Sequence, residues 1–169
     1  DLEKAKDLMT QAGYPNGFEA TIKLPAIYAY AQRAGEVIAD MLGQIGIKLK
    51  IEVVEWGYWL DRVFKQKDFE LTMIGHAEPW DIGIYANPDY YFQYDSQEFR
   101  DAYAKALKAP NEVEKAKWFG RCQELVAEDA VNGFLFLTPS LSAMKAELTG
   151  WWENYPTIAM DCTEVWWKK

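Results

Sequence analysis

Three side chains that can bind a charged group or a metal ion lie close together in the middle of the chain: His76, Glu78 and Asp81. An imidazole with two carboxylates is a ligand set that zinc or nickel accepts. The same segment carries Trp80 and Tyr85, so it also has the composition of a recognition loop, in which a carboxylate pairs with a ligand beside aromatic rings. A well-packed surface loop is the alternative without a ligand. We expect recognition here, and no bound metal.

A second aromatic group, Trp56, Tyr58 and Trp59, directly follows an expected strand over residues 47–54. Aromatic rings at the C-terminal end of a strand can wall a cleft, because α/β folds bind ligands at that edge of the sheet. They can equally cover the edge of the sheet. The loop of residues 75–94 also follows an expected strand, so we expect the two aromatic-rich loops at equivalent ends of adjacent strands, facing one cleft.

Sets of residues that carry out catalysis are scarce. The chain has a single histidine and no G-x-S-x-G turn, so a serine triad has no recognisable nucleophile. Cys122 falls on the apolar face of an expected helix, which indicates a buried thiol. The glycine-rich nucleotide-binding motifs are missing. A glycosidase-type carboxylate pair stays open, but we expect no catalytic residue and no cofactor.

The composition is that of an acidic, folded domain. Eighteen basic and 26 acidic side chains give the 169 residues a net charge of −8, and half of the chain is apolar. The basic residues are scattered along the chain, so a nucleic acid is not an expected partner. No apolar run approaches the roughly 18 to 20 residues that cross a membrane.

The cysteines and the start of the chain leave two questions open. Cys122 and Cys162 fit both a reduced pair and one disulfide. The chain begins at Asp1 inside a helical pattern, without the basic and apolar parts of a signal peptide. We expect either that the start was removed or that this is a piece of a longer protein.

Hydrophobic periodicity predicts an α/β fold. Spacings of three and four residues predict helices over residues 2–12, 28–42, 58–64 and 96–108, and a further helix capped by Asn111 with Glu114 as in a capping box. Alternation and short apolar runs predict strands over residues 18–24, 47–53, 69–74 and 133–137. The first two strands are separated by a crossover long enough for parallel pairing. Together these elements predict a mixed, mainly parallel sheet flanked by helices.

The order of the motifs resembles that of a known family. A-K-x-L-M-x-x-A-G-Y-P-x-G-F at residues 5–18 resembles the start of the C-terminal lobe segment in the extracytoplasmic solute-binding proteins of peptide and nickel ABC transporters, family 5. The match continues with G-I-x-L-x-I-E-V-V-E at residues 46–55, N-P-D-Y-Y-F at residues 87–92 and F-L-F-L-T-P at residues 134–139. It covers essentially the whole chain.

The resemblance implies a periplasmic-binding-protein-like lobe. Intact members are much longer and close two lobes around a ligand, so residues 1–138 would form the C-terminal ligand-binding lobe and residues 139–169 a hinge-crossing tail that returns to the second lobe. The implied protein is not an enzyme. It is the periplasmic or extracytoplasmic component that captures a peptide or other small solute for an ABC permease. The implied partners are the solute, the missing N-terminal lobe and the permease.

The resemblance also implies a site. In peptide-binding relatives a tryptophan and an aspartate follow the buried strand, and the aspartate pairs with the amino terminus of the peptide. Here His76 replaces the tryptophan, so we expect Glu78 as the anchor and Asp81 as the second choice. The departure leaves the solute open among a peptide, a sugar, an opine and a metal complex. The predicted ligand-binding set is Trp56, Tyr58, Trp59, His76, Glu78, Trp80 and Asp81.

Two other functions stay open. One is a stand-alone hydrolase that uses carboxylates within residues 75–94. The other is a non-catalytic interaction domain that docks through its tryptophan-rich tail, residues 151–167.

Overall fold

The computed structural model describes residues 1–76, 81–139, 141–153 and 161–168. The chain forms two compact units, Asp1–Gly75 and His76–Lys169. The expected division into residues 1–138 and 139–169 refers to a two-lobed parent protein and stays a prediction.

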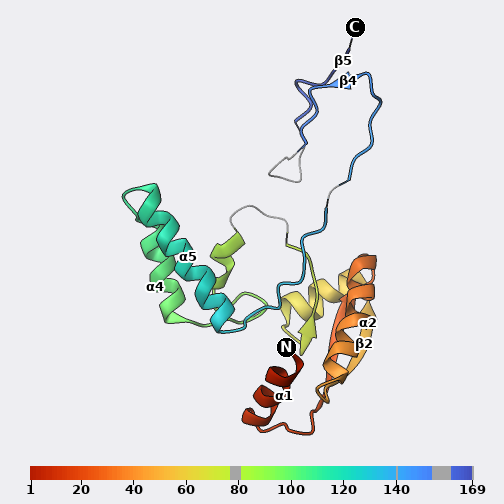
Figure 1. Ribbon diagram of the computed structural model, residues 1–169, viewed down its shortest axis with the longest axis vertical. Helices are drawn as coiled ribbons and strands as arrows, with labels where there is room; N and C mark the ends of the chain where they lie inside the picture. The colour runs from red at the N-terminus through yellow and green to blue at the C-terminus, as the bar shows by residue number, and fades with distance from the viewer. Residues whose placement is uncertain (77–80, 140, 154–160, 169) are drawn as a thin grey trace. The chain divides into compact units, whose positions relative to one another are not determined.

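The first unit contains a parallel sheet of three strands (Figure 1). β1 (Glu19–Pro25) is central, and it pairs on one side with β2 (Lys48–Val54) and on the other with β3 (Leu71–Thr72). α1 (Leu2–Gln11) precedes β1, and α2 (Ala29–Gly43) is the crossover to β2. The predicted α/β fold with a parallel sheet is confirmed. β3 is shorter than the predicted strand of residues 69–74: Met73 is buried as expected, but pairing with β1 ends at Thr72.

Alternation along β1 decides which residues face α2. Ile22 and Leu24 are buried together with Ala31 of α2. The helix approaches the strand closely because it has a glycine there: a Cβ at Gly35 would lie 2.5 Å from Leu24 Cδ1.

The opposite face of the sheet is covered by a helical segment. α3 (Trp56–Tyr58) runs into η1 (Trp59–Lys65), which has π-helical hydrogen bonding, where one helix was predicted. Trp59 Nε1 donates to Thr72 Oγ1 at 2.9 Å, and this hydroxyl donates to the Lys23 carbonyl at 2.7 Å. Lys23 and Thr72 point away from α2 because side chains alternate along a strand. These bonds attach η1 to β1 and β3.

The second unit contains a helical hairpin of α4 (Gln97–Leu107) and α5 (Glu112–Glu128), which lie antiparallel (Figure 1). Asn111 Oδ1 accepts the Glu114 N–H at 2.9 Å, so the predicted cap of α5 is confirmed. The 3₁₀ helix η2 (Asp81–Ala86) packs against the hairpin. The shared core consists of Tyr85, Phe99, Ala102, Cys122, Leu125 and Val126.

The rest of the second unit has little regular structure in its described residues. β4 (Leu148–Thr149) pairs antiparallel with β5 (Trp166–Trp167). The predicted strand at residues 133–137 is wrong. These residues form no strand, and no described strand pairs with them. Cys122 is buried and Cys162 is exposed, and both are free thiols. None of the helices in the described part of the chain is long and apolar enough to cross a membrane.

Candidate functional site

The C-terminal ends of β1, β2 and β3 lie at one edge of the sheet, because the three strands are parallel. The expectation that β2 and β3 are adjacent is wrong, since β1 lies between them. The segment after β1 therefore belongs to the same edge as the loop after β2. Parallel sheets present their ligand sites at this edge.

Four rings form an aromatic cluster at the strand ends: Tyr28, Tyr30, Trp56 and Trp59. Trp56 stacks on Trp59 with 5.1 Å between ring centroids and an interplanar angle of 6°. Tyr28 meets Trp56 edge to face at 5.9 Å and contacts Tyr30 at 5.3 Å. The rings come from the segments after β1 and β2, so packing between the two segments holds Trp56 in place.

The three aromatic residues predicted after β2 differ in exposure. Trp59 is only 2% exposed, so it supports Trp56 from behind and offers little surface to a ligand. Trp56 is half-buried, and Tyr58 is exposed with the Lys23 ammonium 5.9 Å from its ring centroid. Trp56 and Tyr58 are therefore the two members that present aromatic surface.

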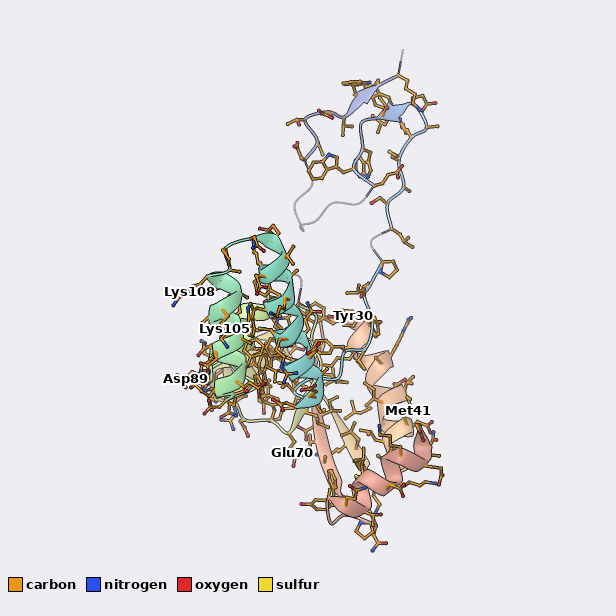
Figure 2. The ribbon with its side chains drawn as sticks, turned by 60° about the vertical axis from the view of Figure 1, so that its left-hand side comes forward. Tyr30, Met41, Glu70, Asp89, Lys105 and Lys108 are labelled. Atoms are coloured by element: carbon orange, nitrogen blue, oxygen red, sulfur yellow. The ribbon has the colours of Figure 1, made fainter. Side chains whose placement is uncertain are left out.

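Tyr28 and Tyr30 were missed by the sequence analysis, which assigned them to the start of a helix. Figure 2 shows Tyr30 at the N-terminal end of α2. Its hydroxyl lies against Gly75, where a Cβ would be 2.9 Å away, and it shares a hydrogen bond with the Gly75 backbone. Burial raises the pKa of Tyr30. The sequence signal that could have identified the two tyrosines as site residues was their position directly after the expected strand of residues 18–24.

A second cluster, the His76 cluster, lies in the second unit and consists of His76, Asp81, Tyr90 and Tyr91. His76 Nδ1 is 2.7 Å from Asp81 Oδ2, and His76 Nε2 is 3.2 Å from the Tyr91 hydroxyl. The imidazole lies nearly parallel to the Tyr91 ring, at 10° and 6.2 Å, and 6.4 Å from the Tyr90 ring. Tyr91 is buried, and burial raises its pKa.

The remaining predicted site residues, Glu78 and Trp80, lie outside the described residues. His76 and Asp81 are brought together as a hydrogen-bonded pair. The part of the chain that the structure describes holds no group of three metal-ligating side chains. Chemically, the carboxylate that His76 holds beside aromatic rings fits the recognition of a cationic group, and the aromatic cluster of the first unit offers surface to an apolar group.

The fold, with its parallel sheet, is that of a lobe of the periplasmic-binding-protein type. Residues 1–105 match the middle part of family 5 of the bacterial extracellular solute-binding proteins. The chain belongs to this family.

Known relatives extend the match over most of the chain. The glutathione-binding protein GsiB of Escherichia coli K12 is 27% identical over 90% of this chain. The periplasmic binding protein DppA of Helicobacter pylori, solved with the peptide STSA, is 32% identical over 78% of the chain with a TM-score of 0.64. The oligopeptide-binding protein AppA of Bacillus subtilis, solved with a nonapeptide, is 20% identical and shares the fold over 99% of the chain, with a TM-score of 0.79.

The relatives are much longer than this chain. It spans 33% of GsiB, 28% of DppA and 37% of AppA.

Proposed function

We propose that this chain is one lobe of the solute-binding component of an ABC transporter, and that it captures a peptide-like solute for delivery to the permease. The observation that carries the proposal is the Asp81 carboxylate, held by His76 beside aromatic rings, in a chain of this family. A carboxylate fixed in this way suits the ammonium group of a peptide. GsiB is named a glutathione-binding protein and DppA was solved with the peptide STSA, which supports the solute class.

Each part of the site has a proposed role. Trp56 and Tyr58 supply aromatic surface for the apolar parts of the solute, with Tyr28 holding Trp56. Asp81 is the proposed carboxylate anchor among the described residues, and Glu78, the first choice from the sequence, and Trp80 remain proposed contacts outside them. That both aromatic-rich loops face one cleft stays a prediction.

The cellular setting follows from the family. Members of this family are bacterial extracellular solute-binding proteins. For this chain we propose an extracytoplasmic location, a second lobe supplied by the same parent protein, and an ABC permease as the receiver of the solute. Binding and release of a solute require no bond chemistry, so we propose no catalytic step.

The test is solute binding by the two-lobed parent protein, measured by isothermal titration calorimetry with the peptide Ser-Thr-Ser-Ala and with glutathione. We expect binding that N-acetylation of the solute weakens. Asp81→Asn should lower the affinity about tenfold or more, because the solute ammonium loses its charged partner. The matched control is Asp101→Asn, an exposed carboxylate on α4 that accepts a hydrogen bond from Gln97 Nε2. Full affinity in Asp81→Asn would contradict the anchor role, and no binding of any peptide would contradict the solute class.

A further inference from the structure

We propose that His76 is a positioning residue, which fixes the Asp81 carboxylate through its Nδ1–H for contact with a solute. The role toward a solute rests on the proposed function, whereas the protonation pattern of the ring rests on the geometry of the His76 cluster alone.

The two neighbours of the imidazole decide where its proton lies. An ionised carboxylate only accepts hydrogen bonds, so the 2.7 Å contact with Asp81 Oδ2 requires a proton on His76 Nδ1. In the neutral ring Nε2 is then an acceptor, and the Tyr91 hydroxyl at 3.2 Å is its donor. Hydrogen bonds therefore run in one direction, from Tyr91 through His76 to Asp81.

Packing keeps this arrangement in place. Tyr91 is 5% exposed, and its ring lies at 10° to the imidazole. Burial first, and then the neighbouring groups Tyr90, Tyr85 and Asp81, raise the pKa of Tyr91, so its hydroxyl keeps the proton that it donates to His76 Nε2.

The Asp81 carboxylate can bind a solute while His76 holds it. An ionised carboxylate accepts several hydrogen bonds, so Asp81 can accept from an ammonium group in addition to the bond from His76 Nδ1. The groups placed against the ring among the described residues are Asp81, Tyr90 and Tyr91.

The first test needs no solute. The chain has a single histidine, so every imidazole resonance of the 169-residue protein belongs to His76. Long-range ¹H–¹⁵N correlation spectra at neutral pH should show a protonated Nδ1 and an unprotonated Nε2. Asp81→Leu, which removes the acceptor for Nδ1–H, should shift the ring toward the other tautomer, and Tyr90→Phe, which leaves both hydrogen bonds in place, should not. A ring protonated at Nε2 in the wild-type protein would overturn the proposal.

The second test measures the affinity of the two-lobed parent protein for Ser-Thr-Ser-Ala at neutral pH. His76→Gln keeps an N–H that can donate to Asp81, so its affinity should stay near that of the wild type. His76→Leu has no such N–H, so its affinity should fall about tenfold. Equal affinities of the wild type and His76→Leu would overturn the role of His76. Absence of binding by the wild type would instead refute the proposed function, while the ring tautomer would still stand or fall by the first test.

Discussion

At the scale of single residues, the distance between α2 and β1 depends on one glycine. A Cβ at Gly35 would lie 2.5 Å from Leu24 Cδ1, and Leu24 is fully buried, so Gly35→Ala must displace a core side chain. We expect urea unfolding to show a loss of about 1–3 kcal/mol. Gly120→Ala is the matched control, because Gly120 lies within α5 with nothing within 4 Å of the added Cβ. It should stabilise by about 0.5–1 kcal/mol, and equal effects of the two substitutions would contradict the packing argument.

Tyr91 should make the protein less stable in alkali. Burial raises the pKa of Tyr91 above its ordinary value of 10.0, so the native state holds the phenol proton more tightly than the unfolded state does. Below pH 10.0 both states are protonated and the contribution is fully present. Above it the unfolded state loses the proton first, so the free energy of unfolding falls as the pH rises. Tyr91→Phe should show a shallower fall than the wild type in urea unfolding between pH 9 and pH 11. Tyr14→Phe, at an exposed ring, should keep the wild-type slope.

The sequence predicts individual residues well where a local pattern decides their position. Cys122 is buried as the helical spacing predicted, and Asn111 caps α5 as its spacing from Glu114 predicted. Trp59 was expected in the wall of a cleft, yet it is buried, because hydrogen bonding to Thr72 draws it under Trp56. That contact joins residues 13 positions apart and leaves no local signal.

At the scale of elements, the cap of α5 is a local contribution to stability that can be measured. Asn111 Oδ1 accepts the Glu114 N–H, one of the unpaired donors in the first turn of the helix. Asn111→Ala should cost about 1 kcal/mol in urea unfolding, whereas Asn111→Asp, which keeps the acceptor, should stay near the wild type. If both substitutions cost the same, the side-chain hydrogen bond would not be the source of the stability.

The order of the strands explains what the sequence analysis missed in the site. Periodicity locates β1, β2 and the region of β3, and the parallel direction follows from the crossover α2. The periodicity of the sequence carries no information on which strand is central. Because β1 lies between the other two, the segment with Tyr28 and Tyr30 joins the strand-end edge. At residues 133–137 the sequence predicted a strand that the structure does not have. A short apolar run predicts a strand, but it does not show whether a neighbouring strand is present to pair with it.

At the scale of the whole molecule, the run of residues 134–137 is an exposed apolar segment in a chain that spans about a third of its relatives. All four side chains, Phe134, Leu135, Phe136 and Leu137, are exposed. A contiguous apolar surface of this kind marks an interface. We therefore expect the proposed second lobe of the parent protein to cover it.

The same substitution made in two contexts tests this expectation. Leu137 is 96% exposed, so in the 169-residue chain Leu137→Ala should change the free energy of unfolding by no more than about 0.5 kcal/mol. In the parent protein the same substitution should cost about 2 kcal/mol or more, because it would remove buried methyl groups. Val113→Ala is the matched control, an exposed apolar residue on the hairpin that should be nearly silent in both proteins. If Leu137→Ala is silent in the parent protein as well, this segment is exposed to solvent there. The exposed run would then need a partner other than the second lobe.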